Sequence, residues 1–109
     1  MAEETNSSER GEIATKLLFE NERVKVWEMR LDPGEATPLH EHHLDNILIQ
    51  ISGDRVAVEP APTTRGEYTE YLEADVFPGN AIYVERGGIE KAVNVGKQPY
   101  YEIIVELKD

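Results

Sequence analysis

Apolar and polar residues alternate with a period of two along most of the chain, which is the pattern of half-buried β-strands. The run Val24–Leu31 alternates around β-branched and aromatic residues and stops at the turn sequence Asp-Pro-Gly of residues 32–34. A second run, Asn46–Ser52, leads into a hairpin turn at residues 52–54. Further extended segments are expected at residues 55–60, 68–72, 81–84, 89–93 and 100–107.

The same alternation assigns residues to faces, because neighbouring side chains of a strand point to opposite sides. In residues 46–52, one face carries Ile47, Ile49 and Ile51, and the other carries Asn46, Leu48 and Gln50. In the last segment, one face carries Tyr101, Ile103, Val105 and Leu107.

Many short strands separated by Gly/Pro turns, with no helix of ordinary length after residue 20, indicate an all-β sandwich or barrel. The start of the pattern is ambiguous. Ile13, Leu17 and Leu18 fit a short helical turn, whereas Leu17 and Phe19 fit a first strand. The polar residues 1–12 are expected to form a disordered N-terminal arm, and residues 13–109 a single domain.

Composition narrows the classes of partner. The 109 residues include 22 acidic and 11 basic side chains, a net charge of −11, and this disfavours nucleic acid and anionic membrane surfaces. There is no cysteine, and therefore no disulfide, thiolate metal site or cysteine nucleophile. The polar, acidic start is unlike a signal peptide, and no apolar run approaches the ~20 residues that span a bilayer. We therefore expect a cytoplasmic protein.

The candidate chemistry lies in a histidine cluster, since all three histidines fall within four residues: His40, His42 and His43. In an extended segment, residues two apart point to the same side, so His40 and His42 can converge on one ion while His43 points away. Two neutral imidazoles suit Zn, Fe, Ni, Cu or Mn once oxygen ligands complete the shell. Alone, such a pair is more often part of a polar surface loop.

The wider spacing resembles the first cupin motif. Gly34, five residues, the pair His40-x-His42, three residues, position 46, six residues and Gly53 match its intervals. Asn46 stands where that family usually has glutamate.

Residues 79–94 resemble the second cupin motif, with Gly79, Gly87 and Asn94 at the expected intervals. Glu90 stands in place of the usual third histidine ligand, and Glu85 in place of the usual proline. The resemblance covers residues 24 to 107. It implies the antiparallel double-stranded β-helix, or jelly roll, of the RmlC-like cupin superfamily. The opening residues 21–31 also resemble small cupins associated with β-alanine degradation.

The usual cupin metal shell of three histidines and one glutamate carries one negative charge. His40, His42, Glu90 and Asn46 would carry the same charge, with the carboxylate moved to the opposite strand. The resemblance therefore implies one divalent transition metal (Fe, Mn, Ni or Zn), with Asn46 as a weaker fourth ligand or a group behind the ligands. Two-histidine-one-carboxylate sites with open positions are typical of non-haem iron oxygenases.

Two alternatives stay open. Asp45 is a competing carboxylate if the turn after His42 shifts the register, and a three-histidine site would need His43 to turn inward. In the second alternative, the substitutions at positions 46 and 90 reflect the loss of metal binding. The pocket is then metal-free, with Glu90 hydrogen-bonded to Asn46 or a nearby tyrosine.

The expected function is a metal-dependent enzyme acting on a small polar molecule in the barrel cavity. An oxygenase or related oxidoreductase is the leading class, and an isomerase or lyase is the next. A non-catalytic small-ligand-binding cupin and a structural dimer with a vestigial pocket are the alternatives, because the fold hosts unrelated functions. A homodimer is expected, with an apolar interface made by N-terminal strands. Candidate pocket residues are Gln50 and Leu48, on the face of Asn46, together with Trp27, Met29 and Tyr83.

Overall fold

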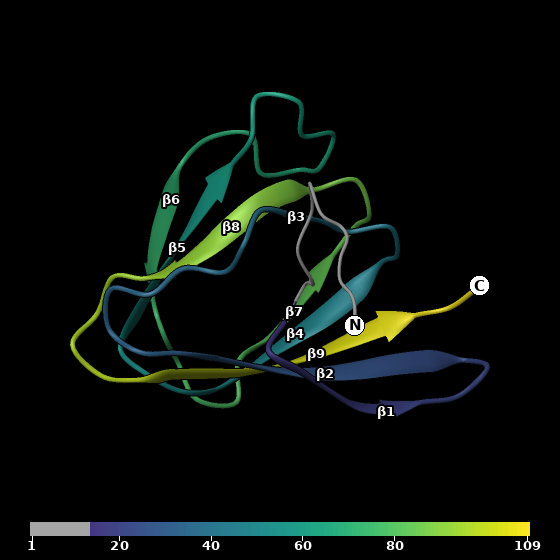
Figure 1. Ribbon diagram of the computed structural model, residues 1–109, viewed down its shortest axis with the longest axis horizontal. Coiled ribbons are helices and arrows are strands. Elements are labelled where there is room, and N and C mark those ends of the chain that lie inside the picture. Colours follow the sequence, from purple (N-terminus) through teal and green to yellow (C-terminus); the bar gives the residue numbers. More distant parts are fainter. Residues whose placement is uncertain (1–13) are drawn as a thin grey trace.

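The computed structural model describes residues 14–109, which form two antiparallel sheets packed face to face (Figure 1). The five-stranded sheet has the order β1-β2-β9-β4-β7 and the four-stranded sheet the order β3-β8-β5-β6. The arm expected at residues 1–12 lies outside the described residues. The strands are β1 (Lys16–Glu20), β2 (Val24–Leu31), β3 (His40–Glu41), β4 (Asn46–Ser52), β5 (Arg55–Pro60), β6 (Leu72–Asp75), β7 (Ala81–Val84), β8 (Ile89–Asn94) and β9 (Tyr100–Leu107).

Alternation predicted most of these strands. Five of the expected segments, at residues 24–31, 46–52, 55–60, 81–84 and 100–107, match β2, β4, β5, β7 and β9. The ambiguous start is a strand, β1, which pairs with β2 through a register shift between Leu17 and Phe19. No helix occurs within residues 14–109, so that part of the chain contains none long and apolar enough to cross a membrane.

The segment expected at residues 68–72 is wrong in its position. Only Leu72–Asp75 pairs with β5, from Val58↔Leu72 to Arg55↔Asp75, and residues 68–71 belong to the connecting loop. Alternation failed here because the Tyr68 side chain faces the interior from an unpaired backbone. The two-residue strand β3 is too short to show a period.

β9 is the central strand of the larger sheet. It pairs with β2 over its full length, from Val24↔Leu107 to Leu31↔Tyr100, and with β4 on its other side. Inward-facing residues of β2 and β9 meet Val56 and Ala92 of the smaller sheet, so the core forms between the sheets. The buried apolar cluster comprises Trp27, Met29, Leu31, Val76, Tyr100 and Ile104.

The two faces of β9 differ from the usual division of polar and apolar residues. Its buried inner face carries two acids: Glu102 is 5% exposed and Glu106 6% exposed. Glu106 is satisfied by the indole of Trp27, whose Nε1 donates a hydrogen bond to its Oε1 at 2.8 Å. The outer face is the apolar one predicted from the sequence, Tyr101, Ile103, Val105 and Leu107, and these residues are half-buried.

The outer face of the larger sheet continues across β4, where Ile47 and Ile49 are half-buried and Ile51 is 40% exposed. The homodimer expected from the sequence, with an apolar interface made by N-terminal strands, stays a prediction. Sedimentation at micromolar concentration and physiological salt tests it, and a monomer under those conditions would contradict it.

Candidate metal centre and ligand cavity

Pairing between β3 and β8 brings the candidate ligands together. His40 and Glu90 are direct cross-strand partners, so their side chains leave the sheet on the same side. Backbone bonds continue this contact past the end of β3. His42 N donates to Gly88 O at 2.8 Å, and Gly87 N donates to His42 O at 2.9 Å. The carboxylate therefore lies opposite the histidines, on the other strand.

The structure gathers His40, His42 and Glu90 into one cluster, in which one ligand atom from each residue lies within 4.8 Å of the others. The imidazole rings meet edge to face, with centroids 4.9 Å apart, and His42 Nε2 lies 3.5 Å from Glu90 Oε2. His40 is 3% and His42 5% exposed, whereas the His43 side chain is 76% exposed. The predicted division of the three histidines is confirmed.

Hydrogen bonding orients the His40 ring toward the cluster. Its Nδ1 lies 3.0 Å from the Pro38 carbonyl oxygen, an acceptor, so Nδ1 carries the ring proton and Nε2 keeps its lone pair. Burial, and to a smaller extent the neighbouring His42, lowers the pKa of His40 to about 4. At neutral pH the ring is uncharged, which is the state that binds a metal.

Asn46 lies against the other side of the His42 ring. The side chain is fully buried, its Nδ2 donates to Leu44 O at 3.2 Å, and the same nitrogen lies 3.5 Å from His42 Nδ1. Its Oδ1 has no hydrogen-bond partner within residues 14–109. Because Glu90 meets His42 at Nε2, Asn46 is placed behind the ring rather than beside the carboxylate.

This orphaned amide oxygen fits a metal site. An imidazole that binds an ion through Nε2 keeps its proton on Nδ1, and that proton requires an acceptor. Rotating the Asn46 amide by a half turn would place Oδ1 there, because the two orientations of an amide are nearly isosteric, but it would break the bond from Nδ2 to Leu44 O. The three donor atoms and their surroundings therefore fit a divalent transition metal, with Asn46 as the residue that orients His42.

Glycine at position 88 leaves room for the cluster. A Cβ there would lie 3.0 Å from Glu90 Oε1 and 3.6 Å from His42 Cδ2, so a side chain would crowd the Glu90 carboxylate and touch His42 at ordinary contact distance. The two adjacent glycines make different contacts: Gly88 lies against Glu90, whereas Gly87 of the second motif packs against Arg65.

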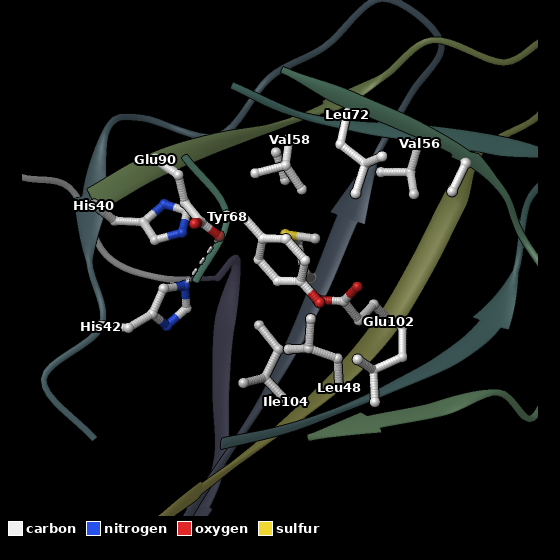
Figure 2. A pocket seen from close by; sticks show the side chains of 14 residues that line it. His40, His42, Leu48, Val56, Val58, Tyr68, Leu72, Glu90, Glu102 and Ile104 are labelled. Atoms are coloured by element: carbon white, nitrogen blue, oxygen red, sulfur yellow. Dashed lines mark ion pairs between the residues drawn. The ribbon is translucent and has the colours of Figure 1, made fainter. Parts of the chain in front are cut away.

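The cluster forms one side of a cavity of about 120 Å³ between the sheets (Figure 2). Most of its wall is apolar, contributed by both sheets. The polar lining side chains are those of the cluster together with Tyr68 and Glu102. The apolar lining residues are Met29, Leu48, Val56, Val58, Leu72, Ala74, Ile82, Ala92 and Ile104.

Two of the five predicted pocket residues, Leu48 and Met29, line this cavity. Trp27 does not. It lies in the core, where its indole nitrogen binds Glu106. Gln50 is buried as expected but sits behind the wall, where its Nε2 donates to the Tyr100 hydroxyl at 3.3 Å.

Tyr83 is misplaced by one residue. It pairs with Ile47 on the outer face of the sheet and is 54% exposed, whereas the preceding Ile82 pairs with Leu48 and faces the cavity. The Tyr83 hydroxyl donates to Asp45 Oδ2 at 2.8 Å. Asp45 also accepts bonds from the Arg86 backbone and guanidinium, at 2.9 and 3.1 Å, so it is held at the surface and does not compete with Glu90.

Sequence reasoning missed Tyr68 and Glu102. Strand alternation could have identified Glu102, because it alternates with the outer apolar residues of β9 and must face inward if they face out. Tyr68 gave no signal, because it belongs to a loop whose path depends on tertiary contacts.

Comparisons with known proteins agree with this architecture. No family model matches the sequence. A cupin domain from Bordetella pertussis superposes with a TM-score of 0.75 at 22% identity, covering 95% of this chain and 100% of that one. An RmlC-like cupin family protein with a double-stranded β-helix fold from Methanocaldococcus jannaschii gives 0.68 at 22% identity, over 85% and 77% of the two chains. By fold, the chain is a cupin.

Among curated proteins, this cupin is similar to auxin-binding protein T85 of Nicotiana tabacum, with 22% identity over 96 residues. That match covers 87% of this chain and 51% of the tobacco protein. The chain spans about half the length of the curated relatives it matches. These likenesses establish the fold, and the function rests on the chain's own residues.

Proposed function

We propose that this cupin binds a divalent transition metal through His40, His42 and Glu90, and that the ion holds a small ligand in the adjoining cavity for oxygenase-type oxidation. The observation that carries the proposal is the placement of two buried imidazoles and one carboxylate within 4.8 Å of one another, at the wall of a cavity. Two-histidine-one-carboxylate sites leave coordination positions open for substrate and O2.

Each residue has a distinct role in this proposal. His40 and His42 offer imidazole nitrogen donors, and Glu90 supplies the negative charge that offsets part of the ion's charge. When bound, the ion would supply Lewis-acid or redox chemistry. The apolar walls exclude water from the ligand, which strengthens electrostatic contacts inside. Their composition favours a largely apolar ligand with a polar head over the small polar molecule expected from the sequence.

Metal titration of the chelator-treated chain tests the first half of the proposal. Calorimetry with Zn²⁺, Mn²⁺ and anaerobic Fe²⁺ should show one site per chain that is lost in His40→Ala and Glu90→Gln. Glu22→Gln makes the same charge change at an exposed position and is expected to bind like the parent. Equal binding by Glu90→Gln and the parent would refute the proposed site.

A second candidate function is ligand binding without turnover. It is favoured by the curated relatives, which are named as auxin-binding proteins. Oxygen uptake by the Fe²⁺-loaded protein with a panel of small carboxylates separates the two candidates. Uptake that depends on His40 supports the oxygenase, and binding without uptake supports the binding protein. The link to β-alanine degradation stays a prediction.

A further inference from the structure

The cavity has a second polar end, formed by Glu102 on β9. This side chain is 5% exposed and lines an otherwise apolar part of the wall. In Figure 2 the histidines and Glu90 lie on one side of the cavity and the Glu102 carboxyl on the other, with the Tyr68 ring between them in this view. The metal site does not use Glu102, and a buried carboxyl is costly unless it has a partner.

A chain of hydrogen bonds with a fixed direction ends at Glu102. The Phe77 backbone N–H, which can only donate, binds Gln50 Oε1 at 3.2 Å. This fixes the Gln50 amide, so that Nε2 donates to the Tyr100 hydroxyl at 3.3 Å. The hydroxyl proton is then directed to Glu102 Oε1, with which it makes a short contact. Oε1 is therefore the acceptor at the end of the chain.

The other oxygen of Glu102 has no hydrogen-bond partner in the described part of the chain, and the residue faces the cavity. Burial raises the pKa of Glu102 to about 7, so the carboxyl holds a proton mainly below neutral pH. Because Oε1 accepts from Tyr100, that proton is carried by Oε2. A donor thus faces a mostly apolar cavity, in which a ligand oxygen or a water could accept it.

We propose that Glu102 Oε2 donates a hydrogen bond to an acceptor oxygen on the ligand, so that the cavity selects small molecules with two polar ends. One end is an anionic oxygen group at the metal site, the other is a carbonyl or ether oxygen at Glu102, and a short apolar body joins them. The inference rests on the proposed function for its first end only. The size limits the apolar body to a few carbons, because apolar cavities of roughly 150 Å³ hold a ligand the size of benzene and this one measures about 120 Å³.

Matched carboxylates test the inference on the full, Zn²⁺-loaded chain. The probes are 4-oxopentanoate and 5-oxohexanoate, each compared with the isostere in which a methyl-bearing carbon replaces the ketone, 4-methylpentanoate and 5-methylhexanoate. The parent should bind at least one oxo acid about three- to tenfold more tightly than its isostere, the value of one neutral hydrogen bond. Equal affinity for both members of each pair would overturn the inference.

Variants then locate the effect. Glu102→Gln should keep the preference, because its Oε1 can accept from Tyr100 while its Nε2 donates into the cavity. Glu102→Leu should lose or reverse it. Glu106→Gln is the matched control, since Glu106 shares the inner face of β9 but binds Trp27 and does not line the cavity. A preference that survives in Glu102→Leu, or disappears in Glu106→Gln, would contradict the assignment.

The two proposals fail differently. If Zn²⁺ increases the affinity of neither oxo acid, the proposed function fails. If Zn²⁺ increases the affinity of both oxo acids but each isostere binds as tightly as its oxo acid, only the inference fails. Carboxyl ¹³C NMR of glutamate-labelled parent protein gives a readout without the leucine variant. The signal lost in Glu102→Gln should be that of a protonated carboxyl at pH 6 and should shift with the oxo acid alone, and an ionised signal at pH 6 would overturn the inference.

Discussion

At the two ends of the cavity, burial shifts the pKa of an ionisable side chain in opposite directions. At one end, burial holds His40 neutral by lowering its pKa to about 4. At the other, burial holds Glu102 neutral by raising its pKa to about 7. Both groups are uncharged between about pH 4 and pH 7, but a neutral imidazole offers a lone pair whereas a neutral carboxyl also offers a proton.

The difference lies in what surrounds each group. The histidines face each other and Glu90 across one small space, so an ion placed there would satisfy all three at once. Glu102 instead receives a bond from Tyr100 at one oxygen and leaves the other toward the cavity. One end is built to accept a cation, and the other is completed by a neutral acceptor. The following substitutions break or sharpen that contrast.

The largest expected effect is at the cation end. Glu90→Gln removes the one carboxylate in the cluster while keeping its size. Loss of groups that merely support metal ligands costs 10- to 100-fold in affinity, so we expect a loss of more than about 100-fold here. Calorimetric titration with Zn²⁺ measures it. A loss below tenfold would mean that another group supplies the charge.

At the opposite end, Glu102→Gln should stabilise the metal-free protein at alkaline pH. The folded pKa of Glu102, about 7, lies above the ordinary value of 4.5. The parent therefore loses stability as pH rises from about 4.5 through 7, and glutamine removes that loss. At about 1.4 kcal/mol per pKa unit, the gain is up to about 3 kcal/mol at pH 8. Urea unfolding at pH 5 and pH 8 measures it, and a difference that does not change with pH would contradict the buried carboxyl.

His40 should give the opposite slope. Its folded pKa of about 4 lies below the ordinary 6.5, so the unfolded chain binds the proton more readily between those values. The metal-free parent should lose stability as pH falls from about 6.5 to 4, by at most about 3 kcal/mol from this group. His40→Gln should flatten that part of the curve. Urea unfolding in chelator across this range checks it, with His43→Gln as the exposed control.

A smaller effect is expected behind the His42 ring. Asn46→Leu removes the amide next to Nδ1 and should weaken metal binding by about tenfold, the lower end for a group that orients a ligand. Asn46→Asp should bind at least as tightly as the parent, because a carboxylate accepts the Nδ1 proton. If Asn46→Leu binds unchanged while Asn46→Asp binds more weakly, the orienting role is wrong.

The smallest effect is expected outside the cluster. His43 points to solvent, and its Nδ1 lies 3.8 Å from Glu41, a surface ion pair of little energetic consequence. His43→Ala should change metal affinity by less than about twofold and stability by less than about 0.5 kcal/mol. Loss of binding in this variant would mean that the metal is held by a surface loop.

The sequence predicts which side chains meet more readily when the residues lie close together along the chain than when they lie far apart. His40 and His42 are two residues apart, so strand geometry alone predicts that they converge. Glu90 lies far along the chain, and only the motif spacing identified it. Gln50 was correctly assigned to the inner face, but alternation cannot show that its amide bonds to Tyr100 and Phe77 instead of lining the cavity. The error at Tyr83 has the same origin, because a shift of one residue exchanges the two faces of a strand.

Glu102 shows the limit most clearly. Its inward direction follows from alternation, yet its place beside the cavity depends on the pairing Gln50↔Glu102 between β4 and β9. The fold class could be predicted because strand rhythm and turn residues recur along the whole chain. The second polar end could not, because it is created by register between strands far apart in sequence.

The central position of β9 also bears on how the chain reaches its native state. β9 follows every strand it pairs with, and its partner residues in β2 lie far back, as in Val24↔Leu107. The pair β1-β2 and the pair β4-β7 can therefore join into one sheet only after β9, the last of the nine strands to leave the ribosome, has been made. Such distant pairings make folding slow compared with helical proteins of this length. Until β9 is inserted, β2 and β4 present unpaired edges, and during synthesis these edges are where a chaperone, or a second nascent chain, would bind.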